Sequence, residues 1–290
     1  MIGPPDRFIE SHAAMCYSNT MPSEAARVDL SIVAPAHNEE GNVGPLVEQI
    51  AAALDGLGVS YEIIIVNDGS TDRTPQVLTE LMGRFPRLRV ISMADTPPGR
   101  GNGQSAAFHA GFRAAAGELI AVLDADLQND PADIPAMLQT LRRTGADVVQ
   151  GDRSADRRDN FLRRVSSLVG RLFRLWLLGD TIRDTGCSLR IMRRQVALAL
   201  PLQFRGMHRF IPVTARALGY TVVEMPVRHR QRVSGEPKYG IWNRAFCGIP
   251  DCLAVRWMRK RRRPIEYETI EARPQAAAPV NRTEMHEARL

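Results

Sequence analysis

Short apolar segments that alternate with helical segments constrain this chain more than any other feature of its sequence. Five runs rich in Val, Ile and Leu occur in the first half, at residues 30–35, 62–67, 88–93, 119–123 and 146–151. Helical stretches separate them, at residues 43–57, after Asp72 and at residues 104–115. Apolar strands that alternate with helices are typical of a parallel sheet covered on both faces. We therefore expect an α/β, Rossmann-like fold with a mostly parallel sheet, whose last core strand is at 146–151.

The charge of the chain indicates an anionic partner. Its 290 residues contain 38 Lys and Arg against 32 Asp and Glu, and the formal net charge is +6. Such an excess suits nucleic acid, a lipid surface or a phosphorylated substrate. The four cysteines are scattered without metal-ligand spacing, which fits a reducing compartment and makes none of them a strong catalytic candidate.

The two ends of the sequence differ in composition from its middle. Residues 1–27 are rich in small polar residues and Pro, and residues 264–290 are rich in Glu, Pro and Ala without periodicity. We expect the first segment to be a disordered leader and the second a disordered tail. No window approaches 18 uninterrupted apolar residues, so a membrane-spanning helix is not expected.

Acidic residues follow one of the predicted strands. Asp124 and Asp126 come after the run at 119–123, and Gln128 lies two residues further on. Ligands of parallel sheets bind at the carboxyl ends of the strands. Carboxylate and amide oxygens at such an end can hold Mg²⁺ or Mn²⁺, which neutralises a leaving diphosphate. The alternative is a polar turn that caps the next helix.

Two further polar loops follow predicted strands. In residues 68–72, Asp68 can accept hydrogen bonds from a ribose or a base, or the segment is a turn in which residue 71 or 72 is a helix N-cap. In residues 35–40, Glu39 and Glu40 can approach a nucleotide or belong to the first turn of a helix. The glycine-rich loop at 100–104 resembles a phosphate-binding loop, but it is weak evidence because it lacks the Lys-Ser/Thr of a P-loop.

Arginines are concentrated directly after the last predicted strand. Seven occur within 22 residues: Arg153, Arg157, Arg158, Arg163, Arg164, Arg171 and Arg174. A solvated helix face is the alternative for any single one of them. Their number beside the polar edge of the sheet favours an anion-binding segment, on a loop that leads into a helix through Leu178.

The order of these motifs resembles that of family 2 glycosyltransferases, in the branch of dolichyl-phosphate mannose synthase and bacterial polyprenyl-phosphate glycosyltransferases, over residues 30–259. The Pro-x-x-Asn-Glu motif is at 35–39, Asp-Gly-Ser-x-Asp at 68–72, and Asp-Ala-Asp-Leu-Gln at 124–128, with a following Asp-Pro. Residues 151–153 and 163–167 resemble the acceptor loop and an Arg-rich acceptor helix. Residues 184–190 resemble Asp-Thr-Gly-Cys-Gly-Leu-Lys, with Ser188 in place of the second Gly, and residues 228–240 resemble an Arg/Gly/Lys-Tyr-Gly loop.

The resemblance implies a GT-A glycosyltransferase domain at residues 28–235 that transfers a sugar, with inversion, from a nucleoside-diphosphate sugar to a polyprenyl phosphate. It implies a divalent metal, Mg²⁺ or Mn²⁺, held by Asp124, Asp126 and Gln128. The implied donor contacts are Pro35, Asn38, Glu39, Asp68, Asp124, Arg230, Arg232 and Lys238. The implied acceptor contacts are Arg153, Arg163 and Ser167.

Catalysis in such an enzyme is expected to be positioning and charge stabilisation by Asp126, Arg153, Arg163 and Asp184. A phosphate monoester has a second pKa of about 6, so the acceptor needs no strong general base. Asp184 orients the acceptor or the sugar, acts as a base for a hydroxyl acceptor, or is only a helix N-cap.

Two other functions compete with this interpretation. A family 2 enzyme that extends a polysaccharide or another hydroxyl acceptor would use a carboxylate base and would not need an arginine-rich phosphate site. A nucleic-acid-binding protein would account for the basic run at 256–263. It would leave the motif at 124–128 unexplained, and aromatic residues, at 6%, are few for base stacking. Nucleic acid is therefore not an expected partner.

Many relatives in this branch carry two C-terminal transmembrane helices, which this sequence does not show, so membrane attachment is expected from another segment. Residues 236–263 predict an amphipathic, basic interfacial helix with two tryptophans, Trp242 and Trp257, and a basic end at 259–263. We expect Pro250 to kink or divide this helix. The alternative is a helix packed on the core with a solvated basic tail. The chain is thus expected to be cytoplasmic and peripheral, on an anionic inner membrane face, in an oligomeric state that the sequence does not indicate.

Overall fold

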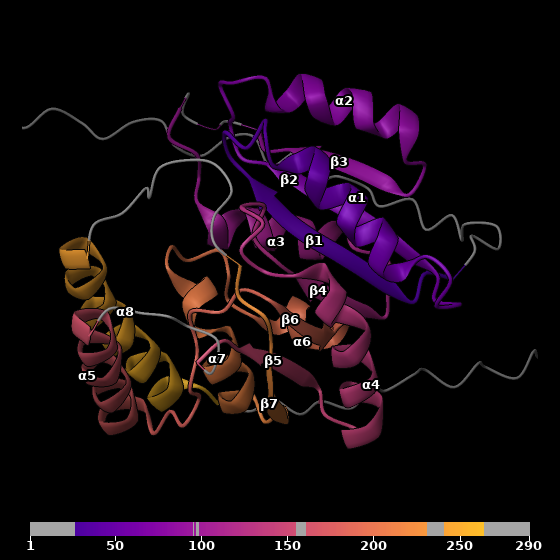
Figure 1. Ribbon diagram of the computed structural model, residues 1–290. Coiled ribbons are helices and arrows are strands. Elements are labelled where there is room, and N and C mark those ends of the chain that lie inside the picture. The colour runs from indigo at the N-terminus through magenta and orange to yellow at the C-terminus, as the bar shows by residue number, and fades with distance from the viewer. Residues whose placement is uncertain (1–26, 95, 97–98, 155–160, 231–240, 264–290) are drawn as a thin grey trace, which may run out of the picture.

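The computed structural model describes residues 27–94, 96, 99–154, 161–230 and 241–263. For residues 161–169 and 241–247 it describes the backbone alone. A seven-stranded sheet in the order β3-β2-β1-β4-β6-β5-β7 crosses it (Figure 1). Its strands are β1 Leu30–Ala36, β2 Tyr61–Asn67, β3 Leu88–Ser92, β4 Leu119–Val122, β5 Val148–Asp152, β6 Arg190–Arg193 and β7 Val222–Pro226.

The sheet is mostly parallel, as predicted. β1 pairs in parallel with β2 and β4, β2 with β3, and β5 with β7, whereas β6 runs antiparallel between β4 and β5. The prediction that residues 146–151 form the last core strand is wrong, because β6 and β7 follow β5 in sequence. β6 also completes the centre of the sheet.

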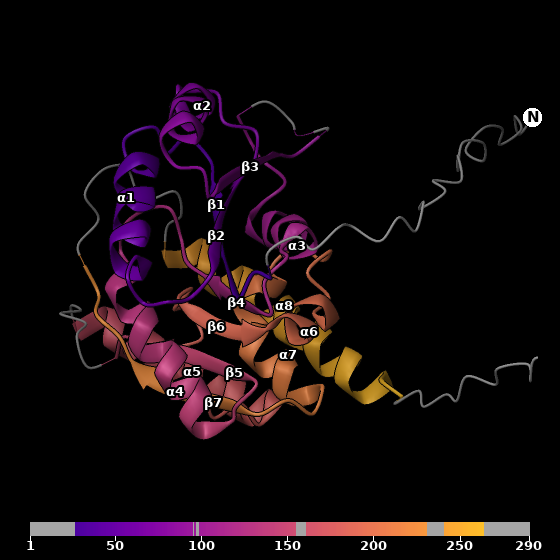
Figure 2. The ribbon, with the colours of Figure 1, turned by 90° about the vertical axis from the view of Figure 1, so that its right-hand side faces the viewer.

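Helices cover both faces of the sheet, which confirms the predicted layers. In Figure 2, α1 and α4 lie on one side of the strands and α3, α6 and α7 on the other. Each face has its own cluster of buried apolar side chains, and α2 contributes to the first cluster and α8 to the second. The helices are α1 Val43–Leu54, α2 Thr74–Arg84, α3 Gln104–Ala114, α4 Ile134–Thr144, α5 Phe161–Leu178, α6 Arg194–Ala199, α7 Ile211–Ala217 and α8 Ile241–Arg261, with two 3-10 turns, η1 Pro131–Asp133 and η2 Met207–Phe210.

The position of α3 depends on a glycine. A Cβ atom on Gly111 would lie 2.4 Å from Val33 Cγ1 and 3.1 Å from Val66 Cγ2. Only glycine therefore allows α3 to approach β1 and β2 this closely. The close packing places the first residues of α3, from Gln104, near the carboxyl ends of the strands.

The helices α5 and α8 lie side by side at one corner of the molecule (Figure 1). Cys252 and Val255 of α8 are buried in the same apolar cluster as residues of the sheet. Arg256 Nη1 donates to the carbonyl oxygen of Leu177 at 3.4 Å, at the carboxyl end of α5. α8 is thus packed on the core along one face.

Several predictions concern the ends of the chain and α8. α8 continues through Pro250, so this proline does not divide the helix, and the alternative that it kinks the helix stays a prediction. No helix of the described residues is long and apolar enough to cross a membrane. The predicted tail at 264–290, and the predicted leader at 1–27 except for its last residue, lie outside the described residues.

Candidate active site

The predicted site loops leave the same edge of the sheet. β1, β2 and β4 are parallel neighbours, and β5 has the same direction because both β4 and β5 are antiparallel to β6. Their carboxyl ends, at Ala36, Asn67, Val122 and Asp152, are therefore on one side. The structure thus brings together the loops at residues 37–40, 68–72, 124–128 and 153.

The first two loops are joined by reciprocal hydrogen bonds. Asn38 N donates to Ser70 Oγ at 3.0 Å, and Thr71 N donates to Asn38 Oδ1 at 2.8 Å. Glu39 N donates to Thr74 Oγ1 at 2.9 Å. The side-chain oxygen of Asn38 therefore holds the second loop, so this predicted donor contact also has a structural role. Pro35 lies beneath it on β1, partly buried.

The alternative interpretation placed residues 39–40 in the first turn of a helix and made residue 71 or 72 a helix N-cap. The structure shows neither arrangement. α1 begins at Val43 with no acidic residue in its first turn, so residues 39–40 precede the helix. The N-cap of α2 is Arg73, which makes no side-chain cap bond. Asp72 nevertheless stabilises the start of α2, because its Oδ1 accepts a hydrogen bond from Thr74 N at 3.0 Å.

Asp68 is surrounded by the glycine-rich loop. Asn102 N donates to Asp68 Oδ1 at 2.8 Å, and Gly103 N donates to Asp68 Oδ2 at 2.7 Å. A Cβ on Gly101, whose φ is +64°, would lie 2.7 Å from Asp68 Oδ2, so this close approach requires glycine. The loop that is weak evidence for a phosphate site therefore positions the predicted donor ligand Asp68. Each carboxylate oxygen retains a second lone pair for a ligand.

Asp124 and Asp126 form the acidic centre of the site. Desolvation and the neighbouring charge of Asp126 raise the pKa of Asp124 to about 6. Asp124 accepts a hydrogen bond from Gln104 Nε2, and the side chain of Ser188 favours its ionised form. Asp126 is buried, and its Oδ1 accepts a hydrogen bond from the backbone N–H of Gln128 at 3.2 Å.

The chemistry of this pair suits a divalent cation. Burial and the charge of Asp126 destabilise the ionised form of Asp124, a metal ion would relieve this, and carboxylate and amide oxygens are ligands of Mg²⁺ and Mn²⁺. Among the described residues, no three His, Cys, Asp or Glu side chains are grouped as a metal site. An octahedral ion held by two carboxylates and Gln128, the predicted set, would leave positions for ligands from a substrate or from water.

Unusual backbone conformations coincide with these loops. Among the described residues, the non-glycine residues with positive φ are Asn38, at 56°, and Leu127, at 60°. Leu127 is buried between Asp126 and Gln128. A left-handed conformation is unfavourable for a leucine and persists only where packing imposes it. Both strained positions lie in predicted binding loops, which supports a functional role for this edge of the sheet.

Arg153 and Asp184 form a buried ion pair. Arg153 Nε donates to Asp184 Oδ2 at 2.8 Å and Nη2 to Oδ1 at 3.2 Å, and the Arg153 backbone N–H donates to Oδ2 at 3.2 Å. Gly186 N donates to Asp184 Oδ1 at 3.1 Å. Asp184 thus orients Arg153, whose charge also interacts with Asp124. β6, not a helix, follows this segment, so the N-cap alternative for Asp184 is wrong.

The segment that follows β7 lies beside the acidic loop. Asn129 and His229 form an isolated antiparallel bridge, and Arg230 N donates to Gln128 O at 2.9 Å. The guanidinium of Arg230, a predicted donor ligand, pairs with Asp130 at 2.7 Å. In this structure Arg230 therefore anchors its segment to the loop that follows the acidic centre.

Some predicted site residues cannot be compared with the structure. The side chains of Arg163 and Ser167 belong to the part of α5 that is not described, and Arg232 and Lys238 lie outside the described residues. Their predicted roles stay predictions.

Other residues of the site were missed by the sequence analysis. Gln104 and Ser188 contact Asp124, and Asn129 Nδ2 donates to Ser188 Oγ at 2.7 Å. Arg190 is buried on β6, close enough for its charge to interact with Asp124. The sequence offered one signal, the serine at position 188 where the resembling motif has glycine.

Burial also explains why a cysteine in this region is not reactive. Cys187 is fully buried, and desolvation raises the pKa of its thiol to about 11. The thiolate, which is the nucleophilic form, is therefore scarce near neutral pH.

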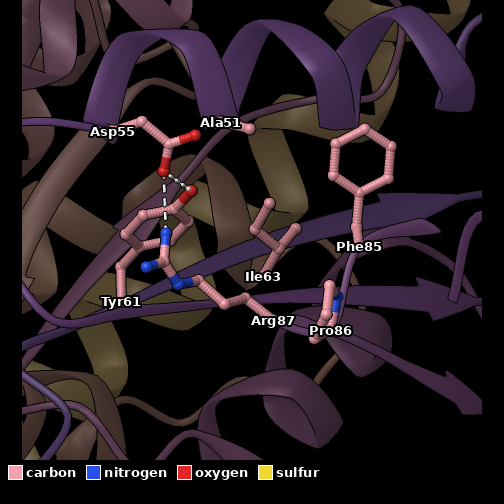
Figure 3. A pocket seen from close by; sticks show the side chains of 7 residues that line it. All are labelled: Ala51, Asp55, Tyr61, Ile63, Phe85, Pro86 and Arg87. Atoms are coloured by element: carbon pink, nitrogen blue, oxygen red, sulfur yellow. Dashed lines mark hydrogen bonds and ion pairs between the residues drawn. The ribbon is translucent and has the colours of Figure 1, made fainter. Parts of the chain in front are cut away.

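A separate hollow lies near the opposite edge of the sheet. Figure 3 shows Asp55, Tyr61 and Arg87 joined at its rim, with Ile63 and Phe85 in its wall. Its volume is about 210 Å³, and ligand pockets usually have about 300–1,000 Å³. Asp55 Oδ1 accepts from both Tyr61 Oη, at 2.8 Å, and Arg87 Nη1, at 2.7 Å. We therefore regard this hollow as part of the packing of α1 on the sheet.

Comparison with known proteins identifies the family of this fold and site. The family model described as glycosyl transferase family 2 matches residues 31–200. The chain belongs to this family. It is therefore a glycosyltransferase, and its fold is the GT-A fold of the structures that it resembles.

Two curated relatives match most of the chain. One is a dodecaprenyl-phosphate galacturonate synthase from Rhizobium johnstonii, 40% identical over 246 residues, which are 82% of this chain and 69% of the relative. Another is an undecaprenyl-phosphate 4-deoxy-4-formamido-L-arabinose transferase from Edwardsiella ictaluri, 38% identical over 73% of this chain and 63% of the relative. The chain thus spans about two thirds of the length of these relatives.

Solved structures share the fold at low sequence identity. A glucosyl-3-phosphoglycerate synthase from Mycobacterium tuberculosis, in complex with Mg²⁺ and uridine diphosphate, has a TM-score of 0.59 and 21% identity over 79% of both chains. A mannosyltransferase from Pyrobaculum calidifontis, in complex with GDP-mannose and Mn²⁺, has a TM-score of 0.57 and 18% identity over 84% of this chain and 70% of that one. Both likenesses support the GT-A fold.

Proposed function

We propose that this enzyme transfers a sugar from a nucleoside-diphosphate sugar to a polyprenyl phosphate, with inversion at the anomeric carbon and with a divalent metal. The observation that carries the proposal is the Asp124–Asp126 pair, two carboxylates at the carboxyl end of β4 that suit a divalent cation, with the buried Arg153 close enough for its charge to interact with Asp124. Relatives that are 38–40% identical have names that specify polyprenyl-phosphate acceptors.

The donor occupies the acidic edge of the sheet in this proposal. Asp124, Asp126 and Gln128 hold the metal ion, which neutralises charge on the leaving diphosphate when it is bound. Asp68, held by the glycine-rich loop, accepts hydrogen bonds from the nucleoside. Asn38 keeps the neighbouring loop in place.

The acceptor phosphate occupies the arginine side of the site. Asp184 orients Arg153 through bonds to Nε and Nη2, so that Nη1 can turn its hydrogens toward a phosphate oxygen. Arg163 and Ser167 contribute further phosphate contacts from α5. The arginines hold the phosphate oxygen in line with the anomeric carbon, opposite the leaving diphosphate.

The role of Asp184 favours a phosphate acceptor over a hydroxyl acceptor. A hydroxyl acceptor needs a carboxylate that can take its proton. Asp184 accepts at least four hydrogen bonds, two from the Arg153 side chain, one from its backbone and one from Gly186 N. These bonds hold both carboxylate oxygens against the Arg153 guanidinium and the Gly186 N–H, and we therefore assign Asp184 a positioning role.

A membrane surface supplies the lipid substrate in this proposal. α5 and α8 carry six of the ten large apolar side chains that are exposed in the described part of the chain: Leu172, Leu175, Trp176, Ile249, Leu253 and Trp257. The hydrogen bond from Arg256 to the carbonyl oxygen of Leu177 joins the carboxyl-terminal parts of α8 and α5, which carry Trp257 and Trp176. Exposed Lys260, Arg261 and Arg263 lie beyond Trp257 and suit anionic headgroups. We propose that the enzyme binds peripherally to the cytoplasmic membrane face through this apolar surface.

The experiment that tests the function is a donor panel. Purified protein is incubated with undecaprenyl phosphate and radiolabelled UDP- and GDP-sugars in the presence of Mg²⁺ or Mn²⁺, and lipid-linked sugar is extracted and counted. We expect one donor to give a lipid-linked product, and we expect Asp126→Ala or excess chelator to abolish its formation. The matched control is Glu80→Ala, which removes an exposed carboxylate on α2 and should retain activity.

Transfer to a soluble glycan but not to the lipid phosphate would instead support the hydroxyl-acceptor alternative. Product formation undiminished by chelator would contradict the metal assignment. Retained turnover without nucleic acid would exclude the nucleic-acid-binding alternative.

A further inference from the structure

A chain of hydrogen bonds connects the acidic centre to a histidine that the proposed mechanism does not use. Gln104, which contacts Asp124, is the first residue of α3, and Ser105 follows it. Ser105 is buried, and its Oγ lies 2.8 Å from His208 Nδ1. The backbone N–H of His208 donates to the same Oγ at 3.1 Å. Two hydrogen bonds therefore join the start of α3 to η2.

The direction of the backbone bond is fixed by its chemistry, and we assign the direction of the other from the hydroxyl proton that remains. The backbone N–H of His208 can only donate, so Ser105 Oγ is the acceptor in that bond. The hydroxyl proton is then available for His208 Nδ1. Burial, together with the charges of Arg209 and Arg190, lowers the pKa of His208 to about 3, so the imidazole is neutral. A neutral ring that accepts at Nδ1 carries its proton on Nε2.

Arg190 connects the other side of His208 to the same acidic centre. Its Nη1 donates to His208 O at 3.3 Å, its Nε donates to Ser188 O at 3.2 Å, and its Nη2 donates to Cys187 O. The side chain of Ser188 in turn favours the ionised form of Asp124. The contacts therefore form a closed ring that begins and ends at Asp124.

We propose that Ser105, His208 and Arg190 are positioning residues of the donor site, which hold Gln104 and Ser188 against Asp124. This inference rests on the proposed function, in which Asp124 binds the metal and the donor diphosphate. The ring sets the position of Asp124 before the donor arrives, so that binding does not have to order this side chain. η2 is consequently part of the donor site although it is far from the acidic motif in sequence.

Two substitutions of His208 distinguish a positioning role from direct contact with a substrate. In His208→Asn, the side-chain oxygen can occupy the place of Nδ1 and accept the Ser105 proton, whereas His208→Gln places its amide near the position of Nε2. We expect His208→Gln and Ser105→Ala each to weaken Mn²⁺-dependent binding of the nucleoside diphosphate about tenfold, the effect of one lost hydrogen bond. We expect His208→Asn to remain within about threefold of the wild type.

The measurement is isothermal titration of the full chain with UDP and with GDP in the presence of Mn²⁺, accompanied by thermal unfolding of each variant. His109→Gln, on α3 but outside the ring, is the matched control and should bind as the wild type does. The double variant Ser105→Ala/His208→Gln should bind no more weakly than Ser105→Ala alone, because Ser105→Ala already removes the side-chain bond that His208→Gln breaks.

Each result has a defined meaning. If the wild type binds neither nucleotide, or if Asp124→Ala binds as well as the wild type, the proposed function fails. If Asp124→Ala abolishes binding but His208→Gln and Ser105→Ala bind normally, the inference fails while the proposed function stands. If His208→Gln bound the nucleotide as the wild type does and His208→Asn did not, the important atom would be Nε2. That result would overturn the positioning role through Ser105. An equal loss in all His208 variants with lowered unfolding temperatures would show a purely structural role, and would also overturn the inference.

Discussion

Removal of Asp184 should expose the energetic cost of the buried arginine beside it. The side chains of Arg153 and Asp184 are 8% and 6% exposed, and their closest contact is 2.8 Å. In Asp184→Ala, the guanidinium loses this carboxylate partner and remains buried. Loss of one partner from a buried ion pair typically costs about 3–5 kcal/mol. Because neither group is substantially exposed, solvent screening does not reduce this value as it does for surface pairs.

The stability of Asp184→Ala can be measured by urea unfolding, followed by circular dichroism, with the midpoint and the m value fitted separately. The matched control is Glu48→Ala, which breaks the surface pair Arg84–Glu48, whose side chains are 64% and 51% exposed. We expect the control to lose less than about 1 kcal/mol. A loss below about 1 kcal/mol in Asp184→Ala, with an unchanged m value, would refute the view that the pair is buried and mutually dependent.

Three further predictions concern charge, acceptor binding and the membrane. The pKa of Asp124 is raised to about 6 in the folded protein, so ionisation of this carboxyl lowers the free energy of unfolding above that pH. This destabilisation should diminish as the pH falls from 7 to about 4. Proton competition should also raise the Mn²⁺ concentration needed for activity below about pH 6, and a metal requirement independent of pH would contradict this. Arg163→Ala should raise the KM for the lipid phosphate by about one to two decades and leave the donor KM unchanged, whereas Arg142→Ala, an exposed arginine on α4, should change neither. A shift in the donor KM would assign Arg163 to the donor. Trp176→Ser combined with Trp257→Ser should reduce flotation with anionic vesicles at least about tenfold without lowering the unfolding temperature, and unchanged flotation would exclude the apolar surface as the anchor.

Much of the sheet could be predicted because its strands are buried on both faces. β1, β2 and β4 consist largely of apolar residues, and the observed bounds differ from the predicted ones by at most one residue at each end. β6 was missed because Arg190 and Arg193 begin and end this four-residue strand. The burial of Arg190 depends on carbonyl groups of residues 187, 188 and 208. The strand propensity of residues 190–193 does not indicate that these distant carbonyl groups will bind Arg190.

The candidate site likewise has residues that could be predicted from the sequence and partners that could not. Asp124 and Asp126 could be predicted because their position after a strand follows from local sequence. Asp68 could also be predicted, but the backbone groups that hold its carboxylate lie 34 and 35 residues away. The partnership of Arg153 with Asp184 spans 31 residues. Such distances are set by the order of strands in the sheet, which includes the unpredicted β6.

The basic end of α8 shows how one composition can serve two purposes. From the sequence, residues 259–263 formed a single cationic group for an anionic surface. In the structure, Arg259 donates to the carbonyl oxygen of Leu178, and Arg262 Nη1 donates to that of Ala217 at 2.7 Å. Carbonyl groups at helix ends lack partners within the helix and carry partial negative charge, so these two arginines stabilise the ends of α5 and α7. The remaining exposed cations follow Trp257 along the helix and can approach a membrane without disturbing the core. The packed-helix alternative therefore holds for one face of α8, and the interfacial prediction stays a prediction for its exposed face.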